Sequence, residues 1–423
     1  MERANNPTGS LDCARDDVKI VRSRVVVSMA GEPIDNGAVA ITGNQIVAVG
    51  RFDQVKANRA GEILDLGEQV LLPGLINAHC HLDYTMLRGR IPPERSFTDW
   101  VRAINARKAA LEEEDYLAAI AAGLAECQNF GSTTLVNLEA FPELLPRVPR
   151  SPLRIWWCAE MIDVRSPVPL PAVADNLHGW FQSHPELRGG IGLAPHAPYT
   201  ASAKLYSETS AGSREYGLLL TTHLAESREE MEMFREAKGP LFEFLKSIGR
   251  SMDDCGNATP LSRLTPNHQI DERWLVAHLN ELSKDDFNLL ARGRKFHVVH
   301  CPRSHTFFGH APFALRRLRA LGFNVCLGTD SLASNSSLSL FSEMRELLRK
   351  EPWIAPREVL EMATANAARA IGRADSLGMI RPGFGADLIA LPAQSRTDIF
   401  GNIVAFEGTV PWMMVDGEVL SPR

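Results

Sequence analysis

Short apolar runs alternate with amphipathic stretches along most of this chain. The segments between the runs, such as EEEDYLAAIAAGLAECQNFG, carry apolar residues at helical spacing and have a Gly near their end. Continuous apolar runs suit parallel strands that are buried on both faces. The pattern therefore predicts strands that alternate with helices. The predicted strands are VLLPGLINAHCH, STTLVNL, LRIWWCAEMI, GGIGLAPHAPYT, GLLLTTHLAE, RWLVAHLNEL, KFHVVHCPRS and FNVCLGTDS.

An eightfold alternation of strand and helix predicts an α/β fold, a TIM-like (β/α)8 barrel. Both ends of the chain differ from this middle part, because they read as short β-branched or alternating strands around Gly-containing turns. We therefore expect four segments. They are a polar tail at 1–17, the first part of a small β-sandwich at 18–70, the barrel at 71–374, and the second part of the β-sandwich at 375–423.

The composition narrows the range of partners and compartments. A net charge of -6 over 423 residues argues against general binding to nucleic acid or to anionic membranes. We see no apolar run of the roughly 18 residues that a membrane span needs, and no apolar signal core at the N-terminus. The seven cysteines contain no C-x-x-C pair, so no disulfide framework is expected. These features predict a cytoplasmic location.

Residues that bind metals or transfer protons stand at the carboxyl ends of six predicted strands. Those ends meet on one face of a (β/α)8 barrel, where active sites are built. Imidazoles and carboxylates suit zinc or iron. The pattern therefore predicts a metal site. The residues concerned are His79, His81, His196, His223, His278, His300 and Asp330, with Glu226 three positions after His223.

Within this set we expect four protein ligands and a bound water. A bound metal lowers the pKa of water from near 16 to about 7, which supplies hydroxide at neutral pH. Glu226 is placed to shuttle a proton, and His278 to hold or polarise the water. His196 either contacts the substrate or is a hydrogen-bonded structural residue. The expected ligands are His79, His81, His223 and Asp330.

Six ordered motifs resemble the amidohydrolase superfamily, specifically its mononuclear deaminase branch. They are PGLINAHCHLDYTMLRG, LAPHAPYT, THLAES, VAHLNEL, VVHCPRS and LGTDSLASN. That branch includes S-adenosylhomocysteine, methylthioadenosine, aminofutalosine and cytosine deaminases and the triazine hydrolases. The resemblance continues to GMIRPGFGADLIAL and MMVDGEVL, which look like the family's small β-sandwich.

The resemblance implies hydrolytic deamination of an amino-substituted heteroaromatic small molecule. In it Asp330 accepts a proton from the water, Glu226 protonates the ring nitrogen and His278 hydrogen-bonds the nucleophile. One divalent ion, zinc or iron, is expected, because the run GGIGLAPHAPYT lacks the lysine that binuclear members usually need. Relatives often form dimers or larger assemblies, so a homo-oligomer is a further expectation.

The predicted substrate contacts differ from those of the adenosine-type members of the family. Adenosine-type members carry a Glu after the first strand that grips ribose, whereas here Lys108 falls near that position. The segment HCPRSHTFFGH adds Arg303 and His305. The three together predict a site for a substrate carboxylate. The alternative is that Arg303 and His305 pair with nearby acids or face solvent.

The sequence leaves two alternative functions open. The first is a hydrolase of the same superfamily that removes chloride, an alkylamine or an amide, since the same hydroxide attacks in each case. The second is a catalytically silent scaffold. Loss of ligands would mark such a scaffold, yet every expected ligand is present.

Overall fold

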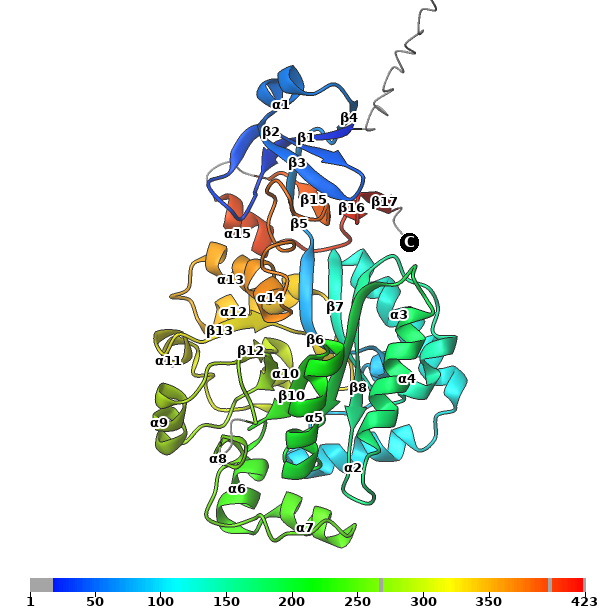
Figure 1. The fold of residues 1–423 in the computed structure, drawn as a ribbon. Helices are drawn as coiled ribbons and strands as arrows, with labels where there is room; N and C mark the ends of the chain where they lie inside the picture. The colour runs from blue at the N-terminus through cyan, green and yellow to red at the C-terminus, as the bar shows by residue number, and fades with distance from the viewer. Residues whose placement is uncertain (1–17, 266–268, 395–397, 421–423) are drawn as a thin grey trace, which may run out of the picture.

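The computed structural model describes residues 18–265, 269–394 and 398–420, and the polar tail expected at 1–17 lies outside them (Figure 1). The strands form two sheets, one of nine strands and one of eight. Figure 1 shows the smaller sheet above the larger one, with the chain passing from β5 (Gln69–Pro73) of the first into β6 (Leu75–His81) of the second. Among the described residues, no helix combines the length and apolarity that crossing a membrane would require.

The larger sheet is the predicted barrel. All eight apolar runs form parallel strands, and neighbours in the sheet follow one another along the chain. The strands after β6 are β7 (Ser132–Glu139), β8 (Arg154–Met161), β9 (Arg188–Pro195), β10 (Leu219–Leu224), β11 (Trp274–His278), β12 (His297–His300) and β13 (Asn324–Leu327).

A two-residue strand, β14 (Asp330–Ser331), closes the barrel. Only Gly328 and Thr329 separate it from β13, and it pairs in parallel with β6. A Cβ on Gly328 would lie 2.8 Å from the Cβ of His79, so the close approach of the two chains requires glycine. The seam is reinforced by Asn77, whose Nδ2 donates to Thr329 Oγ1 at 2.8 Å. The closed parallel barrel predicted from the sequence is thereby confirmed.

Helices surround the barrel in nearly every connection. One connection differs from the expected alternation, because the described segment between β7 and β8 has only a 3-10 helix, η2 (Pro142–Arg147). That segment contains four prolines, which remove backbone donors and oppose a longer helix. The other helices of the barrel are η1 (Leu82–Leu87), α2 (Phe97–Lys108), α3 (Glu113–Asn129), α4 (Leu170–Gln182), α5 (Ala203–Tyr216), α6 (Arg228–Glu236), α7 (Pro240–Ser247), α8 (Pro260–Leu264), α9 (Lys284–Arg292), α10 (Pro302–Phe308), α11 (Leu315–Ala320), α12 (Leu340–Lys350), α13 (Pro356–Met362) and α14 (Ala365–Ala370).

The smaller sheet is built by both ends of the chain, as predicted. β5 joins the two halves, because it pairs in parallel with β1 and antiparallel with β15. Alternate residues of β2 face opposite sides: Val39 and Ile41 pack with Met414, whereas Ala38 and Ala40 pack near α1 (Phe52–Asn58). The other elements are β1 (Val18–Val26), β2 (Ile34–Thr42), β3 (Gln45–Arg51), β4 (Glu62–Asp65), β15 (Leu388–Pro392), α15 (Ile399–Val404), β16 (Trp412–Val415) and β17 (Glu418–Leu420).

The smaller sheet is attached at the amino-terminal ends of the barrel strands. Arg154, the first residue of β8, donates from Nε to Asp387 Oδ2 at 2.6 Å, and Arg188, the first of β9, donates to Asp416 at 3.2 Å. The carboxyl ends of the barrel strands, where an active site is expected, are therefore left free of this sheet.

Candidate active site

A bulge in β6 brings both of its histidines into the barrel. Ile76 and Ala78 pack in the cluster inside the barrel, whereas Cys80 packs in the cluster outside it. The pairing of β6 with β7 shifts register between Asn77 and Cys80. Such a shift reverses the side-chain alternation. His79 and His81 therefore follow Ala78 toward the inside.

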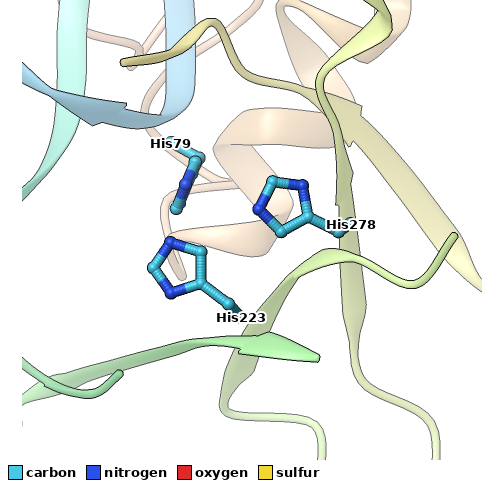
Figure 2. A group of neighbouring side chains, drawn as sticks. All are labelled: His79, His223 and His278. Carbon is cyan, nitrogen blue, oxygen red and sulfur yellow. The ribbon is translucent and has the colours of Figure 1, made fainter. Parts of the chain in front are cut away.

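Four further polar residues reach the same place, three from other strands and Glu226 from the turn after β10. Figure 2 shows the rings of His79, His223 and His278 turned toward one another. His223 and His278 stand in β10 and β11, and Asp330 begins the closing strand β14. The shortest separations are 3.2 Å between His81 Nε2 and His223 Nε2, 3.9 Å from His79 Nε2 to Asp330 Oδ1, and 3.7 Å from His278 Nε2 to Glu226 Oε1. All of these residues are buried.

The donor atoms of this cluster fit a divalent cation. His79 has neither ring nitrogen hydrogen-bonded, and His81 Nδ1 and His278 Nε2 also lack partners. Buried polar atoms are ordinarily hydrogen-bonded, so unpaired imidazoles in this number point to a ligand. Burial, and then the neighbouring histidines, lower the pKa of His79 and His81 well below the usual value, which keeps both rings neutral with a lone pair free for a metal.

Neighbouring groups fix the orientation of His223 and Asp330. His223 Nδ1 lies 2.8 Å from the carbonyl oxygen of His196 and can donate to it, which leaves Nε2 for the centre of the cluster. Asp330 accepts at Oδ2 from the hydroxyl of Ser304 at 2.6 Å and at Oδ1 from the backbone N–H of Ser331 at 2.7 Å.

The backbone is strained where the site residues leave their strands. Ala225, His278, Leu279 and Asp330 have positive φ values of 50°, 74°, 52° and 59°. Such conformations cost non-glycine residues roughly 1–3 kcal/mol each and persist where surrounding contacts hold them. Here the N–H of Leu279 donates to Leu224 at 2.9 Å, so that one strained strand end supports the next.

Glu226 lies beside the cluster as a protonatable group. Burial raises the pKa of its carboxyl well above the usual value, and Asp330 and Glu230 raise it further. The carboxyl of Glu230 accepts the backbone N–H groups of Ala225 and Glu226 at 3.3 and 2.7 Å, which fixes the turn that presents Glu226. The arrangement favours a protonated Glu226, the form that can act as an acid.

The cluster forms one end of a cavity of about 430 Å³. That volume suits a small molecule. Apolar residues of α2 and α7, together with Ile248 after α7, form an apolar wall of the same cavity. The polar end is lined by His81, Glu160, His196, His223, Glu226 and Asp330, and the apolar wall by Phe97, Trp100, Val101, Ile104, Leu241, Phe244, Leu245 and Ile248.

Two of the four predicted substrate contacts border this cavity. His196 lines it, and its Nδ1 is hydrogen-bonded to Thr200 Oγ1 at 2.6 Å. Lys108 lines it as well, donates to the hydroxyl of Tyr84, and has its Nζ 4.5 Å from the centre of the Tyr84 ring. Lys108, the last residue of α2, thus lies at the cavity, as expected for a residue that contacts the substrate.

The structure does not bring Arg303 and His305 to the cavity. Because α10 begins at Pro302, the backbone N–H of Arg303 donates to Glu343 at 2.9 Å, and its guanidinium donates to Ser336 in a separate groove. The ring of His305 is buried with the rings of His300 and His310 at 5.3 and 5.4 Å. The expected carboxylate site of Lys108, Arg303 and His305 is therefore not assembled.

One cavity residue was missed by the sequence reasoning. Glu160 stands near the end of β8, borders the cavity, and has a ligand atom within 4.8 Å of those of His81 and His223. A signal was present, because Glu160 is the one acid in the apolar run LRIWWCAEMI and falls at the strand end where the other site residues lie.

Comparisons with known proteins agree with this geometry. Residues 70–420 match the model of the amidohydrolase family. The chain is 29% identical to a 5-methylthioadenosine/S-adenosylhomocysteine deaminase of Pyrococcus furiosus over 96% of this chain and 92% of the relative. It is 31% identical to the enzyme of that name from Syntrophobacter fumaroxidans, over 89% and 85%.

A solved structure supports the same fold. An adenosine deaminase from Xanthomonas campestris with bound zinc superposes with a TM-score of 0.79 at 23% identity, over 96% of this chain and 93% of that one. Enzymes of the amidohydrolase family use a divalent metal, and the clustered imidazoles and carboxylate suit one. The chain belongs to the amidohydrolase family and is a hydrolase of C–N bonds.

Proposed function

We propose that the chain is a zinc-dependent deaminase, which replaces the amino group of a nucleoside-like heteroaromatic ring by oxygen from water and releases ammonia. The observation that carries the proposal is the meeting of four buried histidines, Asp330 and a protonatable Glu226 at one end of a small-molecule cavity. The deaminase relatives from Pyrococcus and Syntrophobacter support it.

Zinc is proposed because neutral imidazoles with a carboxylate are its usual donors and because the Xanthomonas structure holds zinc. When bound, the ion lowers the pKa of the water that it holds to about 7. The protein ligands would be His79, His81, His223 and Asp330.

The remaining roles belong to side chains that move or hold protons. Asp330, fixed by Ser304, takes the proton of the attacking water. Glu226 is protonated because burial raises its pKa, and it gives this proton to the ring nitrogen beside the attacked carbon. His278, whose Nε2 lacks a protein partner, holds the water in line with that carbon. Asp330 then gives its proton to the amino group, the C–N bond breaks and ammonia leaves, while the proton of the added hydroxyl returns to Glu226.

The apolar wall of the cavity determines where the rest of the substrate lies. Trp100 of α2 and Phe244 of α7 offer flat apolar surface in the wall of the cavity. An aromatic ring or an apolar substituent would be excluded from water there. We propose accordingly that the substrate directs its amino-bearing edge at the histidines and its apolar part at α2 and α7.

We also propose that the enzyme works in the cytoplasm and forms a homo-oligomer. The first proposal rests on the cysteines, because all six in the described part of the chain are free thiols. The second rests only on the tendency of relatives to form dimers or larger assemblies.

Ammonia release by the zinc-loaded protein tests the proposed function. The panel contains adenosine, S-adenosylhomocysteine, methylthioadenosine, aminofutalosine, cytosine, guanine and chlorinated or alkylamino triazines. We expect ammonia from at least one amino-substituted ring, its loss on chelation, and a fall of roughly 10²- to 10⁴-fold in kcat for Glu226→Gln. Release of chloride or alkylamine without ammonia would instead identify the alternative hydrolase.

A further inference from the structure

Glu160 is a carboxyl group in the cavity that the proposed deamination does not use. Its Oε1 is buried and has no hydrogen-bond partner, while the residue as a whole borders the cavity. Among the described residues, no Lys, Arg or His forms an ion pair with it. A buried acceptor without a partner is costly in a folded protein, so its retention in the cavity points to a ligand that donates to it.

The position of Glu160 relative to Glu226 is informative. Ligand atoms of Glu160 fall within 4.8 Å of those of His81 and His223, whereas those of Glu226 fall within 4.8 Å of His278 and Asp330. The two carboxyls therefore stand at different corners of the cluster. A carbon attacked beside these histidines would present one neighbouring ring atom to Glu226 and another to Glu160.

The acceptor role of Glu160 does not depend on its charge. Burial raises the pKa of its carboxyl, and His223 and Lys108 oppose that rise. A carboxyl group keeps an acceptor oxygen in either protonation state, and the unpartnered Oε1 can serve as that acceptor. Lys108 is held by the hydroxyl and the ring of Tyr84.

We propose that Glu160 is a specificity-determining residue that accepts a hydrogen bond from a ring N–H next to the amino-bearing carbon. The preferred substrates are then cyclic guanidines, the 2-amino-4-oxopyrimidine rings found in guanine and isocytosine. This proposal rests on the proposed deamination.

The chemistry of such rings uses both carboxyls. The amino-bearing carbon lies between an N–H, which donates to Glu160, and an unprotonated nitrogen, which receives the proton of Glu226. Water adds to the carbon, its C–N bond to the amino group breaks, and the products are a dioxopyrimidine ring and ammonia. In adenine the corresponding carbon lies between one unprotonated nitrogen and a carbon, so Glu160 would remain unpaired.

The loss of a donor to a buried acceptor gives strong discrimination, of the order of 10⁴-fold at the most demanding sites. We expect the zinc-loaded wild type to deaminate guanosine over adenosine, and isocytosine over cytosine, with a kcat/KM ratio above about 10². Each pair compares a ring that carries the N–H with one that does not.

Glu160→Gln is the decisive variant, because it keeps the shape of the side chain and replaces an acceptor oxygen by a donor. We expect its kcat/KM for guanosine to fall about 100-fold and the guanosine-to-adenosine ratio to fall at least tenfold. Glu139→Gln is the matched control. It makes the same change at the end of β7, where the carboxyl is buried but does not border the cavity, and it should leave the ratio unchanged.

Three results would overturn the proposal. The first is an equal loss for guanosine and adenosine in Glu160→Gln. The second is a wild-type preference for adenosine and cytosine. The third is a fall in zinc per chain in Glu160→Gln, measured by elemental analysis, which would make Glu160 a metal ligand instead.

Failure of the proposed deamination would be recognised separately, by the absence of ammonia from every ring with the wild type. Calorimetric binding of guanosine and adenosine to the zinc-loaded protein then tests Glu160 by itself. At least tenfold weaker guanosine binding in Glu160→Gln, with adenosine unaffected, supports the recognition role. Unchanged binding of guanosine overturns it.

Discussion

Two groups of buried histidines occupy the same barrel and differ in what surrounds them. In both, burial lowers the pKa of the imidazoles below the usual value, and in both some ring nitrogens have no partner. The first group is the site cluster of His79, His81, His223 and His278. The second, which we call the outer cluster, consists of His300, His305 and His310.

Among the described residues, only the site cluster brings three or more donor atoms together. In the outer cluster His310 Nδ1 lies 4.0 Å from Glu281 Oε1. His79, His81 and Asp330 have ligand atoms within 4.8 Å of one another, and the described residues of the outer cluster form no such group. His300 stacks instead on Phe313, with ring centres 3.9 Å apart and planes 4° from parallel. Burial keeps an imidazole neutral, with a lone pair available to a metal. A metal site also needs several donor atoms that point to one place, as in the site cluster. The difference can be tested by treating the two clusters identically.

The largest expected difference is in activity. We expect His223→Ala to lose most of its zinc and at least about 10³-fold in kcat/KM, because it removes a proposed ligand. His305→Ala, the matched change in the outer cluster, should keep one zinc per chain and most of the activity. Elemental analysis and ammonia release measure both. Loss of zinc from His305→Ala would contradict the claim that the site cluster alone binds the metal.

Metal binding should stabilise the protein through the site cluster alone. At a free zinc concentration 1,000 times Kd, the free energy of unfolding should rise by about 4 kcal/mol. Denaturant titrations with zinc and with a chelator measure this difference. We expect it to persist in His305→Ala and to vanish in His223→Ala, and an equal gain in both variants would contradict the assignment.

Support of Asp330 by α10 should have an intermediate effect. Removing the hydroxyl that holds this carboxylate in Ser304→Ala should lower zinc affinity or kcat/KM by roughly 10- to 100-fold. Thr306→Val, on the same helix but exposed and bonded to Glu346, serves as the control. If both variants were as active as the wild type, the hydrogen bond to Asp330 would have no role in the site.

The smallest expected effect is the pH dependence contributed by the outer cluster. Burial lowers the pKa of His305 to about 4 in the folded chain, against an ordinary value of 6.5. Between these values the unfolded chain binds a proton that the folded chain does not, so stability is lost as pH falls from 6.5 toward 4.

For His305→Asn without metal, we expect this slope to be shallower than in the wild type by up to about 1.4 kcal/mol per pH unit. Urea unfolding at pH 7 and pH 5 measures it. Gln182→Asn, on an exposed position of α4, removes no titratable group, so it is the control and should keep the wild-type slope. A slope that is unchanged in His305→Asn would show that its imidazole is protonated in the folded state.

The barrel and most of the site could be predicted because strand ends are visible in the sequence. An apolar run marks a strand, and the carboxyl end of each barrel strand faces the active site. A residue at such an end, for example His81 or Asp330, can therefore be placed in the site from the sequence alone. The strands of the smaller sheet could be predicted from their alternation, but their pairing through β5 could not.

Arg303 and His305 could not be placed from the sequence, because they lie beyond a strand end in α10. The first turn of that helix donates a hydrogen bond from Arg303 N–H to Glu343, which lies on α12 about 40 residues further along the chain. A contact between residues so far apart in the chain leaves no pattern in the sequence around Arg303. Glu160 was missed for the opposite reason, since its position at a strand end was visible and only its residue type set it apart from the expected ligands.

The position of β5 also has a consequence for the order of folding during synthesis. β5 pairs with β15, and about 315 residues separate Pro73 from Leu388. At roughly 5–20 residues per second, β5 waits about 15 to 60 s for that partner. From β6 to β12, by contrast, each barrel strand pairs with the next one to be made. We therefore expect the barrel to assemble on the ribosome first and the sheet of the two chain ends to close last.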